Sequence, residues 1–241
     1  MKYNNSITDF FKSPQWGMNL LLGAVAILIP VIGQMAISGW HITLLWARGD
    51  DEDPADYPPF DFTHFSKYLE RGVWPFLVRL VASFVLISVV MILMAFMFFR
   101  LLASHSYHHN PGAFPAIFFI VIFLIYPVFL IACCCLLTPL LVRGTITQDF
   151  AKAFNIQFMR SFLTLVWKEL LVSMLYISGA VLCLMIVALC TCYIGGFLLA
   201  PVVMFSWHHL EKQLYHVYLS RGGKAVPQSP NLFDIPPQPP G

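Results

Sequence analysis

Five ionisable side chains, which lie toward the two ends of the chain, are the first candidates for chemistry. They are His41, His208, His209, Glu211 and Lys212. Imidazoles beside a carboxylate can relay protons or bind a metal ion. His208 and Glu211 are three residues apart, so a helix places them on one face. If the two ends of the chain pack together, His41, His208, His209 and Glu211 predict a shared polar cluster. The alternative is that these side chains reach toward a polar interface.

Three further histidines occur in the segment His105-x-x-His108-His109, just before Asn110-Pro111-Gly112. Two or three imidazoles can bind a transition metal weakly. Neither a carboxylate nor a thiolate accompanies them, and a polar turn explains them equally well. We therefore expect no metal ion and no cofactor.

The six cysteines fit packing better than chemistry. Cys133, Cys134 and Cys135 are adjacent within an apolar stretch, where cysteine behaves as a small apolar residue. Cys183, Cys190 and Cys192 form no Cys-x-x-Cys pair of the kind found in zinc or redox sites. Phosphate-binding glycine loops and His-Glu-x-x-His are also missing from the sequence. The sequence thus predicts a protein that is not an enzyme.

The overall composition is that of a membrane protein. Hydrophobic residues make up 59% of the 241 residues and charged residues only 11%, and the mean hydropathy is +0.74. A soluble domain usually carries about 25% charged residues. The net charge of +2 is too small to indicate a nucleic-acid partner. The expected partner is therefore the lipid bilayer.

Long uncharged runs predict the membrane spans of an all-α, polytopic fold. A bilayer core about 30 Å thick needs about 20 apolar helical residues. Transmembrane strands would instead alternate in hydrophobicity, and these runs do not. The predicted spans are 80–99, 116–142, 170–189 and 195–218.

The N-terminal run 16–47 is too long for one simple span and too short for two full ones. Pro30 and Gly33 in its middle favour a kink or a turn. The run is therefore either one kinked helix or a hairpin of two short helices. Lys2 and Lys12 precede it as in a signal peptide, but no clean small-x-small cleavage site follows, so we expect it to be retained.

The distribution of Lys and Arg favours the hairpin. Eleven of these residues fall in segments 48–79 and 143–169 and in the C-terminal part, against one in segment 100–115. By the positive-inside rule the first three regions are cytoplasmic. The prediction is about six membrane segments with both termini in the cytoplasm. A single kinked span with an external N-terminus is the alternative.

The whole chain reads as one helical membrane domain, residues 1–226, followed by a tail. Residues 1–15 are expected to be a cytoplasmic N-terminal segment, and 48–79 an acidic loop and interfacial helix. Residues 227–241 are rich in proline and almost without apolar side chains, so a disordered tail is predicted.

A second interfacial helix is predicted after residue 145. Thr145-x-x-Gln148 resembles a capping box. An apolar stripe follows at helical spacing, as expected for a helix lying in the headgroup plane on the cytoplasmic side. The stripe consists of Ile146, Phe150, Phe154, Phe158, Phe162 and Leu165.

A faint internal repeat links the two ends of the chain. Ile32-Gly33 is followed by Ser38-Gly39-Trp40-His41, and Ile194-Gly195 by Ser206-Trp207-His208-His209. Gly23-Ala24-Val25 and Gly179-Ala180-Val181 precede the two copies. The pattern predicts two related helical hairpins around a central pair of spans. Coincidence in an apolar background is the alternative.

The N-terminal third also resembles a known family. The matching residues are Trp16, Gly23, Pro30, Gly33 and Gly39, the loop Tyr57-Pro58-Pro59-Phe60-Asp61-Phe62, and Gly72. Over about residues 9–80 they resemble the prokaryotic multi-pass membrane family catalogued as domain of unknown function four-thousand-and-thirteen. The resemblance implies a bacterial or archaeal membrane protein. It supplies neither an activity nor site residues.

These observations lead to two functional expectations. The first is a non-enzymatic scaffold or accessory subunit in a prokaryotic cell membrane, which packs against other membrane subunits or a second copy. It rests on the scarcity of ionisable residues in the spans. The second is a small-solute transporter or channel built from the two related hairpins.

Overall fold

All regular secondary structure in the described part of the chain is helical. A computed structural model describes residues 1–47, 53–105 and 113–232. It has short 3-10 turns at Pro54–Asp56, Phe62–His64 and Pro230–Leu232. The all-α prediction is confirmed for these residues. The α-helices are α1 (Asn5–Lys12), α2 (Trp16–Ile27), α3 (Ile32–Leu45), α4 (Phe65–His105), α5 (Ala113–Thr147), α6 (Phe150–Ala153), α7 (Ile156–Cys190) and α8 (Ile194–Ser220).

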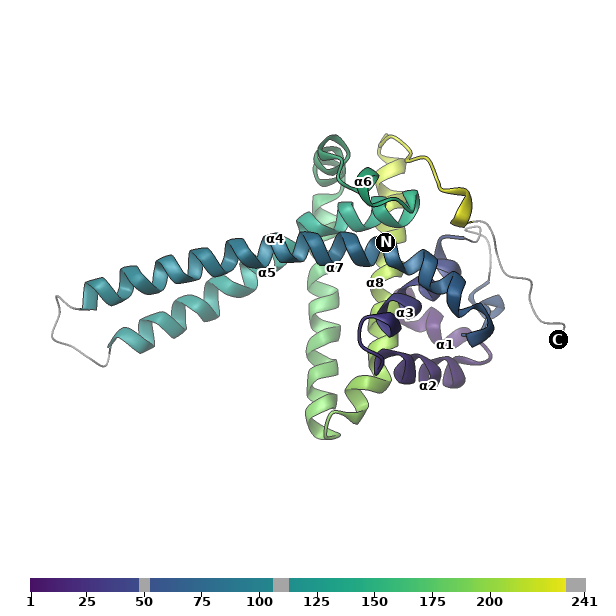
Figure 1. Ribbon diagram of the computed structural model, residues 1–241, viewed down its shortest axis with the longest axis horizontal. Helices are drawn as coiled ribbons and strands as arrows, with labels where there is room; N and C mark the ends of the chain where they lie inside the picture. The colour runs from purple at the N-terminus through teal and green to yellow at the C-terminus, as the bar shows by residue number, and fades with distance from the viewer. Residues whose placement is uncertain (48–52, 106–112, 233–241) are drawn as a thin grey trace.

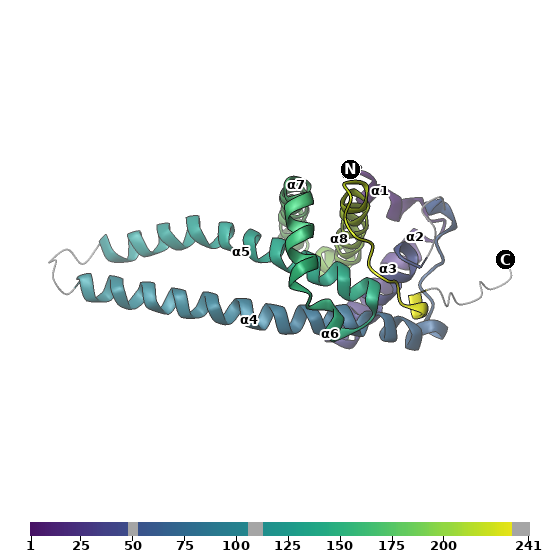
Figure 2. The same cartoon turned by 90° about the horizontal axis from the view of Figure 1, so that it is seen from above.

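Two long helical hairpins cross each other steeply. Figure 1 shows α4 and α5 side by side, extending to the left away from the body, while α7 and α8 stand across them. Viewed from above in Figure 2, α7 and α8 are seen nearly end-on and the α4–α5 hairpin still runs across the picture. The short helices α1, α2 and α3 pack around α8 and the start of α4.

Within the residues that the structure describes, three helices are long and apolar enough to cross a membrane. They comprise Phe62–Arg100, Val128–Thr147 and Ile156–Cys190. The predicted spans 80–99 and 170–189, and part of 116–142, fall inside them. The predicted span 195–218 lies in α8, whose second half turns polar at His208. Helices α2 and α3 have 12 and 14 residues, fewer than the roughly 20 that a full crossing needs. The described chain thus supports three membrane-length helices, and the six spans are not established by it.

The run 16–47 folds as two separate helices, α2 and α3. The turn between them places Val31 at φ +65°, a rare conformation for a β-branched residue. Gly33 lies directly against the end of α2, where an added Cβ would be 1.6 Å from the carbonyl oxygen of Ala26. Only glycine permits this approach, so Gly33 fixes how tightly the chain turns.

The predicted interfacial helix after residue 145 is wrong in its boundaries. Thr145 is fully buried inside α5, so it does not cap a helix. Helix α5 ends at Thr147, and Gln148 takes φ +48°. Asp149 and Asn155 then cap α6 and α7, each accepting a backbone N–H at 3.1 and 2.8 Å. Both are strong N-cap formers, and they divide one predicted helix into three pieces.

The phenylalanine stripe of that predicted helix is divided as well. Phe158 and Phe162 turn inward and pack around the ring of Tyr218 on α8, with centroids 5.4 and 5.3 Å away. Phe154 stays 41% exposed. The shorter interfacial helix expected within 48–79 is also absent as a separate element, because Phe65 onward belongs to α4.

The loop before α4 packs firmly on α3. Phe60 is buried against the rings of Trp40 and Tyr68, each with a centroid separation of 5.5 Å. The side-chain oxygen of Asn19 accepts the Phe60 backbone N–H at 2.9 Å, and the Trp40 indole N–H donates to the Pro58 carbonyl at 3.3 Å. These contacts account for the Tyr57–Phe62 motif.

The C-terminal segment returns across the helices. Val226 and Leu232 are buried, and the Ser229 N–H donates to the Ile146 carbonyl at 2.9 Å. The carbonyl of Asn231 accepts Nε and Nη2 of the buried Arg71, both at 3.1 Å. Residues 227–232 therefore differ from the predicted disordered tail. The rest of that tail, 233–241, lies outside the described residues.

A Leu232→Ala substitution tests whether this docking stabilises the fold. Leu232 is 1% exposed, and truncating a buried leucine costs about 2–5 kcal/mol. We expect the purified variant to unfold at a lower temperature in detergent. The matched control is Leu182→Ala on α7, where the side chain is 60% exposed and little change is expected. Equal effects of the two substitutions would show that the segment is not docked.

Candidate functional site

The structure brings three of the four predicted cluster residues together in the interior. His208 and Glu211 of α8 are 2% and 1% exposed. His208 Nδ1 lies 2.9 Å from Glu211 Oε2, and the Trp207 indole N–H donates to Glu211 Oε1 at 2.6 Å. Ser38 Oγ of α3 lies 3.0 Å from His208 Nε2. Each carboxylate oxygen thus has a donor, and the imidazole is held at both nitrogens.

His41, one turn after Ser38 on α3, lies beside this group. It is fully buried, and its ring lies 5.9 Å from that of His208 and 5.6 Å from that of Phe205. Neither of its ring nitrogens has a hydrogen-bond partner among the described residues. Buried polar groups normally have such a partner, so His41 is the exception within the cluster.

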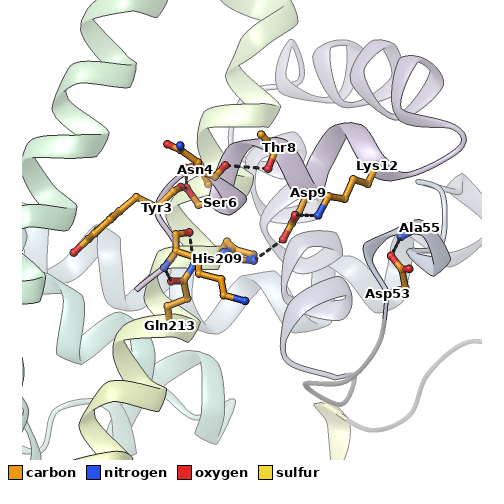
Figure 3. A network of polar contacts seen from close by, with 12 residues as sticks. Tyr3, Asn4, Ser6, Thr8, Asp9, Lys12, Asp53, Ala55, His209 and Gln213 are labelled. Atoms are coloured by element: carbon orange, nitrogen blue, oxygen red, sulfur yellow. Dashed lines mark hydrogen bonds and ion pairs between the residues drawn. The ribbon is translucent and has the colours of Figure 1, made fainter.

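His209 points away from this group, toward α1. Its Nε2 lies 3.4 Å from Asp9 Oδ2, and its Nδ1 lies 2.9 Å from the Gln213 side-chain nitrogen. Asp9 also pairs with Lys12 at 2.7 Å, which raises the pKa of Lys12 above its ordinary value. Figure 3 shows Asp9 lying between Lys12 and His209. These residues line a surface pocket of about 420 Å³.

Sequence reasoning missed Asp9 and did not predict the long helix that carries Arg71 and Arg79. Residues 1–15 were expected to form only a cytoplasmic segment, although Asp9 and Lys12 have the i,i+3 spacing of a helical ion pair. Arg71 was expected on a short interfacial helix and Arg79 in the same segment 48–79, and both lie within the long helix α4. Arg71 is 3% exposed and donates to Thr43 Oγ1 at 2.8 Å.

A second cavity lies between α4, α5, α7 and α8. Its volume is about 260 Å³ and its walls are mostly apolar. Two polar side chains lie at its wall, the guanidinium of Arg79 and the imidazole of His208. The lining includes Arg79, Cys134, Leu141, Ile177, Trp207 and His208.

The other chemical candidates find no support in the described residues. His105 ends α4, and His108 and His109 lie outside the described ranges. No group of three side chains able to hold a metal ion occurs in the described part of the chain. All six cysteines are free. Three are half-buried in α5, and the other three are exposed: Cys183, Cys190 and Cys192.

The two copies of the predicted repeat adopt similar local structures. Helices α3 and α8 both begin at an Ile-Gly pair that follows a residue with positive φ, Val31 at +65° and Tyr193 at +70°. Each is preceded by an apolar helix, α2 or α7, across a tight turn. The copies also meet, because Ser38 of one contacts His208 of the other.

The cluster can hold or exchange a proton, since an imidazole and a carboxylate share a hydrogen bond away from water. Ser38 Oγ, the His208 imidazole and the Glu211 carboxylate are joined by hydrogen bonds in that order, which is the arrangement of a nucleophile, a base and an orienting acid, and Glu211 also accepts from Trp207. Ser38, His208 and Glu211 are 7%, 2% and 1% exposed, so little of this hydrogen-bonded group is reachable from the surface.

Comparison with known proteins identifies the family. No curated protein and no solved structure matches the chain. Residues 22–202 match the family described as "Protein of unknown function (DUF4013)". This match extends well past residue 80, where the motifs end, and it covers most of the chain, including the second half of α2, all of α3 to α7 and the start of α8. The chain therefore belongs to the DUF4013 family.

Proposed function

We propose that this chain is a non-enzymatic integral membrane protein of a prokaryotic cell membrane, acting as a scaffold or accessory subunit. The observation that carries the proposal is the exposed apolar surface of α4. Only 6% of its most apolar 18-residue window is buried inside the chain. Phe84, Ile92 and Phe96 are 72%, 69% and 64% exposed. Apolar surface of this extent marks a membrane or partner interface.

The steep crossing of the hairpins supports a role in packing with other chains. A spanning helix in a self-contained bundle presents one face to its own neighbours. The α4–α5 hairpin instead leaves the body (Figure 1), so its sides are available to other membrane helices. The distribution of Lys and Arg supports a position of both termini in the cytoplasm.

Photo-crosslinking in native membranes tests this proposal. A photoreactive amino acid at Phe96 is expected to form adducts of discrete mass with another membrane protein or a second copy. The same group at Phe205, which is fully buried, serves as the control and should form none. Should Phe96 give lipid adducts alone, and should the chain extracted in mild detergent always run as a monomer, the scaffold role is rejected.

A small-solute transporter or channel is the second candidate. It is favoured by the contact between the two repeat copies and by the buried His41, His208 and Glu211, since ionisable groups at depth often mark a transport pathway. Reconstituted vesicles loaded with a pH-sensitive dye test it. Proton flux that a Glu211→Gln substitution abolishes supports transport, and the absence of flux in wild-type vesicles counts against proton coupling.

A further inference from the structure

Arg79 places a positive charge in an unusual environment. It lies in the membrane-length segment Phe62–Arg100, immediately before the exposed apolar stretch that starts at Leu80. Among the described residues, no hydrogen bond or ion pair holds its guanidinium. Arg71, two turns earlier on the same helix, is by contrast bonded to Thr43 and Asn231. A charged group in apolar surroundings is costly unless it is paired.

The cavity beside Arg79 offers no carboxylate to neutralise it. Its 260 Å³ are lined by apolar side chains, with His208 at the wall. Glu211 in the neighbouring cluster is already engaged on both oxygens, by Trp207 and His208. Arg79 is half-buried at this wall, so an anion from outside the chain can reach its guanidinium.

The guanidinium of Arg79 and the apolar walls of the cavity together define the chemistry of that anion. A guanidinium presents a planar fork of N–H donors that fits a carboxylate or a phosphate. The apolar walls, among them Val203 and Trp207, suit an alkyl chain and do not suit a hydrated ion. We infer that this cavity binds an amphiphilic anion, with its carboxylate or phosphate on Arg79 and its alkyl chain between α5, α7 and α8. The inference does not depend on the proposed scaffold role.

Bromine quenching of tryptophan fluorescence tests this binding. The full chain in a mild non-ionic detergent is titrated with dibromostearate, whose bromines quench an indole on contact. We expect saturable quenching that a Trp207→Phe variant largely loses, because Trp207 lines the cavity. The uncharged methyl ester of the probe should bind about tenfold or more weakly, since hydrogen bonds to a charged group are lost.

Variants distinguish the contribution of the Arg79 charge to binding from the contribution of the cavity's apolar space. Arg79→Gln should weaken dibromostearate binding about tenfold or more, while Arg79→Lys should retain part of it. Arg100→Gln is the matched control, an exposed arginine on the same helix, and should leave binding unchanged. Val203→Phe fills the cavity without changing charge and should also weaken binding. Circular dichroism and gel filtration verify that each variant is folded.

A second arm distinguishes the source of the anion. The Trp207-dependent quenching is repeated in nanodiscs that contain brominated phosphatidic acid or brominated phosphatidylcholine. Quenching by phosphatidic acid that requires Arg79 identifies a bilayer lipid, and quenching by dibromostearate alone identifies a soluble amphiphile. If folded Arg79→Gln binds both acidic probes as well as wild type does, or if the ester matches the acid, the inference is overturned.

Discussion

A Gly39→Leu variant is expected to fail to fold, because α3 and α4 touch through their backbones at this position. A Cβ on Gly39 would lie 1.8 Å from the carbonyl oxygen of Tyr68 and 2.9 Å from the backbone nitrogen of Gly72. Ordinary over-packing costs about 1–3 kcal/mol, but there a side chain can usually move. Here only separation of two helices relieves the clash, so we expect about 4 kcal/mol or more. Gel filtration after detergent extraction should show aggregate in place of folded protein.

The partner glycine and an open glycine provide the controls. Gly72→Ala should be as damaging as Gly39→Ala, because its Cβ would lie 1.9 Å from the Met35 carbonyl oxygen. The double variant should lose less than the two single losses added together, since separating the helices once makes room for both methyl groups. Gly179→Ala on α7 meets nothing within 4 Å and should be neutral or stabilise by about 1 kcal/mol. Similar melting temperatures for Gly39→Ala and Gly179→Ala would contradict the close crossing.

The helical class could be predicted because it depends on local composition. In an uncharged run of membrane length, a helix satisfies every backbone hydrogen bond within the segment. The runs 80–99 and 170–189 fall within α4 and α7. Pro30 and Gly33 likewise marked the turn between α2 and α3. The spacing of His208 and Glu211 predicted a shared helical face, and the two side chains are hydrogen-bonded.

The remaining features depend on contacts between distant segments. Thr145 and Gln148 match a capping pattern, yet packing buries Thr145 inside α5 and the chain breaks at Asp149 and Asn155 instead. Arg71 was predicted to lie on a short interfacial helix, and its burial could not be predicted because its acceptor Asn231 is 160 residues away. The contact of His209 with Asp9 is also a contact between distant segments. It depends on how α1 lies on α8, which no local pattern specifies.

The two His-containing motifs show one feature that local sequence predicted and one that it did not. Their similarity predicted two related hairpins, and α3 and α8 do begin alike. The motifs do not play equivalent parts, however. His208 is hydrogen-bonded at both ring nitrogens, whereas His41 is bonded at neither among the described residues. The difference arises because Glu211 follows His208 by one turn and no acid follows His41 at that spacing.

Replacing Glu211 with leucine should destabilise the protein by about 3 kcal/mol or more. The carboxylate accepts hydrogen bonds from the Trp207 indole and from His208 Nδ1. Leucine leaves both donors without an acceptor in a buried site, and that loss is not compensated by water. The free energy of unfolding in detergent, measured from denaturant titration, checks this. Glu169→Gln is the control, because the ion pair of Glu169 with Arg221 is partly exposed and should contribute less than about 1 kcal/mol.

Glu211→Gln should separate the role of the charge from that of the hydrogen bonds. The amide oxygen can still accept from Trp207, while the amide nitrogen now faces His208 Nδ1. A neutral imidazole can accept there if its proton moves to Nε2, which can then donate to Ser38 Oγ, 3.0 Å away. We therefore expect a loss of only about 1 kcal/mol together with a change of tautomer at His208. Nitrogen chemical shifts of labelled histidine would report that change, and unaltered shifts in a folded Glu211→Gln protein would mean that Glu211 does not set the proton position on His208.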